Sequence, residues 1–154
     1  MRKLLISTLL ALVIPAAASA HDAWHHHHHA LLAKLSGTGT LAGSSGSMTS
    51  DKLGNGTFTA SVATTGAAVT HTGDRGTLSC APASASLTLA GTSTSTSTLT
   101  GKECTWTPVG STTAAGSMFF GRNSTTRLFL VAKSDGTVRG AVFAGMRHRD
   151  DGDD

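Results

Sequence analysis

The two cysteines of the chain, Cys80 and Cys104, constrain how the segment between them folds. Thr92 lies midway between them, in a Gly-Thr-Ser sequence that is typical of a turn. A hairpin that folds back at Thr92 places the two cysteines directly opposite each other. We therefore predict a disulfide, which closes a loop of about 25 residues and contributes about 3.5 kcal/mol in the chain-entropy model. Two free buried thiols are the alternative.

The first twenty residues are organised like a secretory signal peptide. Arg2 and Lys3 precede an apolar run from Leu4 to Ile14, and the segment ends in Ala-Ser-Ala. This run is shorter than the roughly 20 residues that cross a bilayer. We expect cleavage after Ala20, a secreted or periplasmic location, and no membrane span in the mature chain. An oxidising compartment agrees with a disulfide.

Charge after the signal peptide is nearly balanced. Removing Arg2 and Lys3 from the 12 Lys and Arg leaves 10 against 9 Asp and Glu, a formal charge of +1. The remaining basic residues are scattered singly, whereas a nucleic-acid binder clusters them to contact phosphates. No nucleic-acid partner is expected.

Composition and turn signals predict an all-β fold. Thr is abundant, only 14% of residues are charged, and apolar residues recur between turn signals. A disordered stalk usually has fewer β-branched residues and more charge. We predict a single antiparallel barrel or sandwich of about 8–10 short strands, with a disordered or short helical N-terminal leader. The expected strands cover residues 38–43, 46–53, 57–65, 67–72, 77–81, 85–90, 96–107, 117–121, 126–133 and 137–145.

The expected organisation has four parts: a signal peptide (1–20), a His-rich leader (21–36), a β domain (37–146) and a charged tail (147–154). Two segments stay ambiguous. Residues 30–35 fit a strand or a short helix, and residues 94–100, TSTSTST, fit a strand covered by hydroxyl groups or a solvated loop.

Two Asx-Gly pairs, Asn55-Gly56 and Asp135-Gly136, predict two-residue hairpin turns. The first turn places Leu53 opposite Phe58. The second places Lys133 opposite Val138, Val131 opposite Gly140 and Phe129 opposite Val142. Both faces of this second hairpin carry apolar residues, so we expect it to be buried at the centre of the fold.

One strand region has an internal conflict of phase. Leu78 and Cys80 fall on one face of an ideal strand, whereas Leu87 and Leu89 fall on the other. Pro82 lies between the two pairs, so we predict a bulge or bend there.

A histidine run follows the signal peptide and offers ligands for Cu²⁺, Zn²⁺ or Ni²⁺. Cleavage after Ala20 makes His21 the N-terminal residue, which resembles the copper-chelating amino-terminal histidine of secreted copper oxygenases and copper carriers; the resemblance covers this one residue and the compartment. A natural tract without selected affinity and a purification tag are the alternatives. The candidate ligands are His21, His25, His26, His27, His28 and His29.

Motifs for catalysis are scarce, and we expect no enzyme activity and no required cofactor. His71, near Asp74, is the candidate for an alternative hydrolase function, but a surface histidine beside a turn is the simpler interpretation. Asn55 and Asn123 lie in glycosylation sequons, which matter only in a eukaryotic source.

The sequence thus predicts an exported, non-enzymatic binding or surface-interaction module with a metal-binding leader. Its partner is a metal ion or an extracellular molecule of unspecified identity. A barrel that binds a small apolar ligand is a further alternative, and Trp106, Arg122 and Arg127 are candidates to line its cavity.

Overall fold

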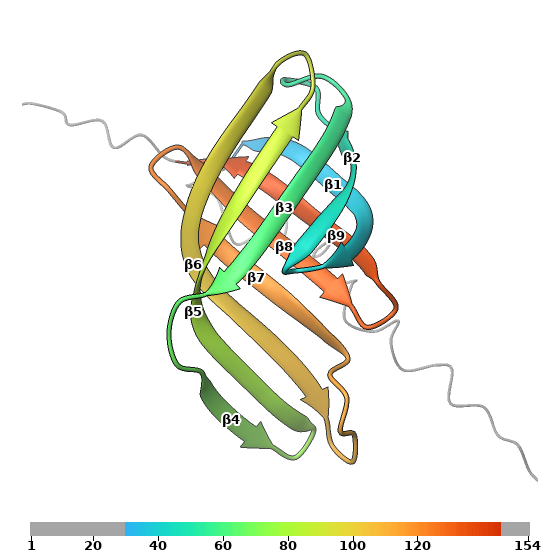
Figure 1. Ribbon diagram of the computed structural model, residues 1–154, viewed down its shortest axis with the longest axis vertical. Coiled ribbons are helices and arrows are strands. Elements are labelled where there is room, and N and C mark those ends of the chain that lie inside the picture. Colours follow the sequence, from blue (N-terminus) through green and yellow to red (C-terminus); the bar gives the residue numbers. More distant parts are fainter. Residues whose placement is uncertain (1–29, 146–154) are drawn as a thin grey trace, which may run out of the picture.

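The computed structural model describes residues 30–145, and this part of the chain is built from β-strands. It contains nine strands and no helix, which confirms the predicted all-β class (Figure 1). Within residues 30–145 no helix is long and apolar enough to cross a membrane. The strands are β1 (Leu31–Thr40), β2 (Gly43–Thr49), β3 (Gly56–Thr64), β4 (Val69–Gly73), β5 (Gly76–Ala90), β6 (Thr94–Pro108), β7 (Gly116–Arg122), β8 (Thr126–Lys133) and β9 (Thr137–Ala144).

Eight of these strands close into an antiparallel barrel. Neighbouring strands follow the order β3-β2-β1-β9-β8-β7-β6-β5, and β3 pairs with the second half of β5 to complete the ring. A closed ring leaves no exposed sheet edge along its circumference. The fold is therefore a barrel and not a sandwich.

The strand β4 lies outside the ring and pairs only with the first part of β5, residues 76–80. In Figure 1, β4 and the adjoining parts of β5 and β6 project beyond the lower end of the barrel. The β5–β6 hairpin therefore serves two purposes. One half forms barrel wall, and the other carries a small projecting sheet.

Of the bulge or bend predicted at Pro82, the bulge is wrong, because β5 and β6 pair without interruption from Gly76↔Pro108 to Ala90↔Thr94. Pro82 marks the point where β5 changes its other neighbour from β4 to β3. Its carbonyl accepts a hydrogen bond from the Thr65 amide at 2.8 Å, and its missing N–H removes nothing from the β5–β6 ladder. The expected strands 77–81 and 85–90 are one strand that keeps a single phase.

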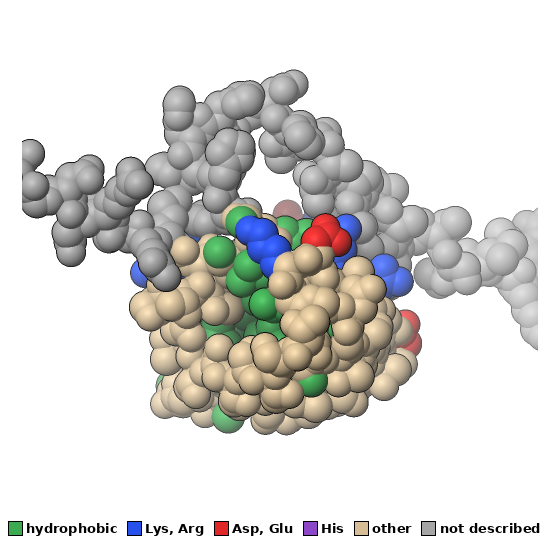
Figure 2. Space-filling model, turned by 90° about the horizontal axis from the view of Figure 1, so that it is seen from above, with side chains coloured by type: hydrophobic (Ala, Val, Ile, Leu, Met, Phe, Trp, Pro, Cys, Tyr) green, Lys and Arg blue, Asp and Glu red, His purple; other side chains and the backbone are tan. Residues whose placement is uncertain are grey.

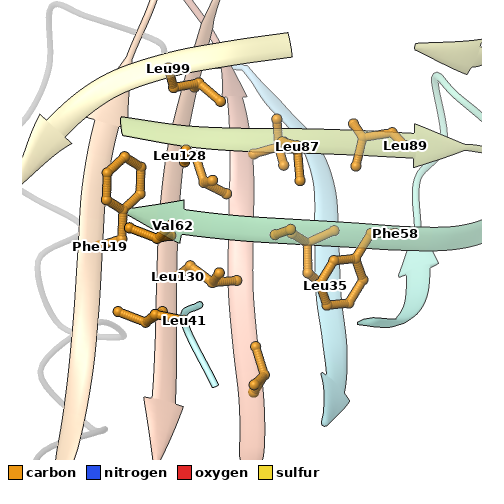
Figure 3. Close-up of a cluster of buried hydrophobic side chains, with 14 of the residues drawn as sticks. Leu35, Leu41, Phe58, Val62, Leu87, Leu89, Leu99, Phe119, Leu128 and Leu130 are labelled. Carbon is orange, nitrogen blue, oxygen red and sulfur yellow. The ribbon is translucent and has the colours of Figure 1, made fainter. Parts of the chain in front are cut away.

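The barrel interior holds one hydrophobic core. Alternate residues of each strand face inward, as Leu87 and Leu89 of β5 and Leu128 and Leu130 of β8 do (Figure 3). Burying a side chain of this size stabilises the fold by about 1.5–3 kcal/mol. The largest fully buried side chains are Phe58, Phe119, Met48, Leu87, Leu99, Leu128, Leu130, Val138 and Val142.

The strand β1 begins at Leu31, six residues before the expected start of the β domain at 37. Ala33 and Leu35 are buried and alternate with exposed Lys34 and Ser36. Pairing with both β2 and β9 makes this segment a central strand, which its short apolar pattern did not reveal. Residues 21–29 of the leader and the tail 147–154 lie outside the described residues. The TSTSTST segment is the start of β6.

The Asp135-Gly136 hairpin exists, but its predicted register is wrong by one residue. Phe129 lies opposite Ala141, and Leu128 lies opposite Val142. The turn has three residues: the Gly136 amide donates to the Lys133 carbonyl at 3.0 Å, and Gly136 has a φ of 82°. This is the geometry of a type I turn followed by a left-handed residue, which glycine adopts without strain.

The other two predicted pairs, Lys133 with Val138 and Val131 with Gly140, are wrong by the same one-residue shift. Val131 lies opposite Arg139, and Val138 lies opposite Ala132. The Thr137 amide donates to the carboxylate of Asp135 at 2.8 Å, which lowers the pKa of that carboxyl group. The extra turn residue decides which hydrophobic residues pair across the hairpin.

The Asn55-Gly56 turn is not formed as predicted. β3 begins at Gly56, which lies opposite Met48, and Phe58 lies opposite Gly46 instead of Leu53. The connection is longer because side chains close it: the Ser50 amide donates to Oδ1 of Asn55 at 3.1 Å. Local hydrogen bonds from serine and asparagine compete with a tight turn.

The predicted disulfide between Cys80 and Cys104 is confirmed. The two residues are direct cross-strand partners in the β5–β6 hairpin, with a Cα–Cα distance of 4.0 Å. The hairpin turns at residues 91–93, as the midpoint at Thr92 predicts. A disulfide is consistent with an extracellular or periplasmic location.

Candidate interaction surface

Several large hydrophobic side chains lie on the outside of the sheet. Phe120 is 58% exposed, Phe129 is 40% exposed and Met118 is 38% exposed. Each alternates with an inward-facing residue, as Phe129 does between Leu128 and Leu130. The β7–β8 region is therefore hydrophobic on both faces, but only one face is covered by other strands.

These outward residues are neighbours across the strands. Phe120 of β7 lies directly opposite Phe129 of β8, and Phe129 lies opposite Ala141 of β9. In the adjacent row, Met118 lies opposite Val131. Because cross-strand partners are about 5 Å apart, the side chains form one continuous patch.

Basic side chains are interleaved with this patch. Lys102 lies opposite Phe120, and Arg139 lies opposite Val131. Arg122 lies opposite Arg127, a pairing of like charges that destabilises a sheet when nothing compensates it. We call this surface the basic apolar face. Its apolar residues are Leu31, Met118, Phe120, Phe129, Val131 and Phe143, and its basic residues are Lys34, Lys102, Arg122, Arg127, Lys133 and Arg139.

Acidic residues within 30–145 lie elsewhere. Asp51, Asp74 and Asp135 are in turns, and Glu103 is half-buried between the inward-facing residues Ala81 and Phe119. Every Lys and Arg that belongs to a described strand is on the basic apolar face. A chain with a formal net charge of only +3 thus has one strongly basic side.

The remaining outer surface has a different chemistry. Outward positions of β2, β3 and the first half of β6 are mostly Ser and Thr, and Thr88 and Thr96 share a hydrogen bond of 3.0 Å across β5 and β6. Viewed from above, uncharged polar side chains and backbone cover most of the visible surface, and the basic side chains lie in its upper part together with hydrophobic and acidic ones (Figure 2). The barrel is therefore two-sided.

The apolar surface continues onto the projecting end of the β5–β6 hairpin. Leu78 and Trp106 are opposite each other, and His71 of β4 lies beside Leu78. His71 and Trp106 line an open depression of about 430 Å³ together with residues 72–76 of the β4–β5 turn. Trp106 therefore borders a surface depression and not the barrel interior.

The hydrolase alternative required His71 to contact a carboxylate and a serine. His71 is exposed on β4, and the neighbouring Thr70 and Thr72 direct their hydroxyls to Ser79 and Thr77. Within residues 30–145, His71 has no hydrogen bond with a carboxylate or serine. The arrangement required for this hydrolase is not formed among the described residues.

The small-ligand alternative required an interior wider than its side chains fill. All eight barrel strands contribute inward residues to one packed cluster that includes Phe58 and Phe119 (Figure 3). This packing favours a structural role for the interior. Arg122, also proposed to line a cavity, is exposed on the outer face.

The predicted metal ligands His21 and His25–His29 lie outside the described residues. Within residues 30–145, no three His, Cys, Asp or Glu residues come together as a metal site. The leader joins the barrel at Ala30, whose carbonyl accepts a hydrogen bond of 2.9 Å from the Ala144 amide. Metal binding by the leader stays a prediction.

The two sequon asparagines both have structural partners. Asn123 donates from Nδ2 to the Thr98 carbonyl at 3.1 Å, and its Oδ1 accepts from the Thr126 amide at 2.8 Å. Asn55 accepts from Ser50, as described above. These contacts explain both residues without a glycan.

The sequence contains the signal for the basic apolar face, but the same pattern also predicts burial. Hydrophobic residues on both faces of 128–131 and the phase difference between Leu78 and Leu87 both arise from this outer surface. A sheet covered on both faces and a sheet with one exposed apolar face have the same pattern. Only the arrangement of the other strands distinguishes them.

Comparison of the chain with protein-family models, with curated proteins and with solved structures gives no match.

Proposed function

We propose that this protein is an exported, non-enzymatic interaction module that docks onto its partner through the basic apolar face. The observation that carries the proposal is the exposed Phe120–Phe129 pair at the centre of a basic surface. Soluble proteins seldom leave contiguous large hydrophobic side chains uncovered, and such patches commonly mark interaction sites.

Burial supplies the driving force for docking. Covering a phenyl side chain contributes up to about 1.5–3 kcal/mol relative to full exposure. Phe120 and Phe129 have lost part of their water contact already, so each contributes a fraction of that amount. The surrounding Lys and Arg side chains add attraction to an anionic partner and increase the rate of encounter.

Export and metal binding belong to the same proposal. The signal-like segment 1–20 supports export, and the five consecutive histidines after Trp24 support loose capture of Cu²⁺, Zn²⁺ or Ni²⁺. The leader joins the chain at Ala30, next to β9 and close to Leu31 of the basic apolar face.

The docking surface is tested with anilinonaphthalene sulfonate, a fluorescent probe that is both aromatic and anionic. We expect the probe to bind the folded protein and the double variant F120S/F129S to bind at least about tenfold more weakly, because more than about 1.4 kcal/mol of apolar contact is lost. Both residues are exposed, so the variant should keep its circular dichroism spectrum and melting temperature.

The matched control is Val109→Ser. Val109 is 71% exposed in the loop after β6 and lies outside the basic apolar face. Probe affinity should be unchanged in this variant. Equal loss of affinity in V109S and F120S/F129S, or no loss in either, contradicts the proposal.

A further inference from the structure

The basic apolar face has the composition of a surface that binds lipid. Resting on the proposed function, we infer that the partner is a lipid layer with anionic headgroups, on which the barrel lies by this one side. Apolar side chains at the centre enter the boundary between headgroups and acyl chains, while basic side chains contact the headgroups.

The distribution of side chains along the strands fits such a boundary. In one cross-strand row, Lys102, Phe120, Phe129 and Ala141 follow one another, and Lys34 ends the row on β1. The two phenyl groups are thus flanked by lysines on either side. A lysine side chain can lay its aliphatic stem on the apolar surface and extend its ammonium group to a phosphate.

Trp106 extends the same surface on the projecting hairpin. It is half-buried beside Leu78, and the two residues lie opposite each other. Tryptophan is enriched where an apolar region meets water, because its ring is apolar and its N–H is a hydrogen-bond donor. The hairpin end therefore adds a second apolar contact. The disulfide-bonded pair Cys80 and Cys104 lies between the Leu78–Trp106 pair and the row that begins at Lys102.

The hydroxyl side of the barrel limits the depth of binding. Thr57 and Thr59 on β3 and Thr96 and Thr98 on β6 are exposed on that side. Moving hydroxyl groups from water into hydrocarbon without hydrogen-bond partners is costly. Contact restricted to the basic apolar face avoids this cost.

A second copy of the chain is a poorer partner. A two-fold dimer places the same patch on both subunits, so two faces that each carry Lys102, Arg122 and Arg139 would meet. Like charges brought together across an interface cost several kcal/mol. An anionic surface instead pairs with every one of these groups.

A nucleic acid also presents phosphates, but the apolar part of the face does not suit it. Single strands are bound by aromatic side chains that stack on bases inside a basic groove. Here the aliphatic residues Met118, Val131 and Leu31 belong to the patch as well as the phenyl groups, and the outside of a barrel is convex.

The test uses the mature chain, residues 21–154, with a chelator present so that no metal is bound at the histidines. Binding is measured by co-sedimentation with vesicles of phosphatidylcholine alone and of phosphatidylcholine mixed with phosphatidylglycerol. A Trp24→Phe background leaves Trp106 as the only tryptophan, so its emission reports whether the hairpin end enters an apolar environment.

We expect binding to the anionic vesicles, a blue shift of Trp106 emission, and loss of binding at high salt. K102Q/R122Q should bind about thirtyfold more weakly, since each basic residue near an anionic surface contributes roughly fivefold. The charge control is Lys52→Gln, because Lys52 is exposed in the β2–β3 connection and belongs to no strand of the face. It should bind like the unmodified protein.

Three outcomes overturn the inference. The first is equal affinity for neutral and anionic vesicles, or none for either. The second is binding to a single-stranded oligonucleotide that competes with the vesicles and is insensitive to F120S/F129S. The third is a dimer in light scattering that F120S/F129S dissociates. If face-dependent binding of the sulfonate probe persists in these cases, the docking surface stands and only its lipid partner is rejected.

Discussion

At the scale of single residues, small side chains in the barrel decide where large ones fit. Gly121 faces inward two residues after Phe119, and a side chain at position 121 would collide with the phenyl ring of Phe119. A tapering interior is filled by alternating large and small residues. The glycines of this chain are therefore partly core residues, although the sequence shows them only as candidate turns.

Ser50 is a buried polar residue whose contribution to stability can be measured. Its Oγ accepts a hydrogen bond from the Leu53 amide at 2.9 Å and donates to the Leu32 carbonyl. Ser50→Ala leaves both backbone groups without this partner, so we predict a loss of about 1–3 kcal/mol in the free energy of unfolding by urea. Ser45→Ala, on the exposed side of the preceding strand β2, should change it by less than about 0.5 kcal/mol. Equal effects of the two substitutions would show that the Ser50 contacts contribute little.

At the scale of elements, the β5–β6 hairpin is the unit that joins the barrel to its projecting end. Its 15-residue strands pair along their whole length, but only the second half of β5 also pairs with β3. The disulfide lies in the other half, where β4 is the outer neighbour. The disulfide thus links the two strands in the part of the hairpin where β5 does not pair with β3.

Removing this disulfide should therefore weaken the hairpin end more than the barrel. For C80S/C104S we predict a loss of about 3 kcal/mol in unfolding free energy. Hydrogen exchange should accelerate first in β4 and residues 76–80, because these amides open without opening the ring. Reduced wild-type protein should behave like the variant. Uniform acceleration across all strands would contradict a local role.

A control for this experiment is the exposed cross-strand pair Thr88 and Thr96. Replacing both with alanine removes one hydrogen bond from the same hairpin, in the half that belongs to the barrel. The expected loss is within about 1 kcal/mol.

At the scale of the whole molecule, we propose separate roles for the basic apolar face and the histidine leader. If the leader is the metal-binding part, deletion of residues 21–29 should abolish binding of Cu²⁺ and Zn²⁺ measured by calorimetric titration. The unfolding free energy of the barrel without metal should stay unchanged, since β1 begins at Leu31. An affinity for Cu²⁺ that survives the deletion would move the metal site elsewhere in the chain.

The local sequence determined much of this protein. The midpoint at Thr92 predicted the Cys80–Cys104 pairing, the spacing of turn signals predicted an all-β fold, and the TSTSTST pattern allowed a strand. These properties depend on period-two alternation and on residues that favour turns, which neighbouring positions carry. They can be read without knowing what packs on the strands.

Only the tertiary structure decided which apolar face became the core. Leu128 and Leu130 are buried and Phe129 is exposed, although all three fit the interior of a sheet equally well. The choice follows from closure of β3 on β5 and from the one-residue register difference at the Gly136 turn. Alternation specifies that a strand has two faces, but burial depends on strands distant in sequence, and their closure left one hydrophobic face on the outside.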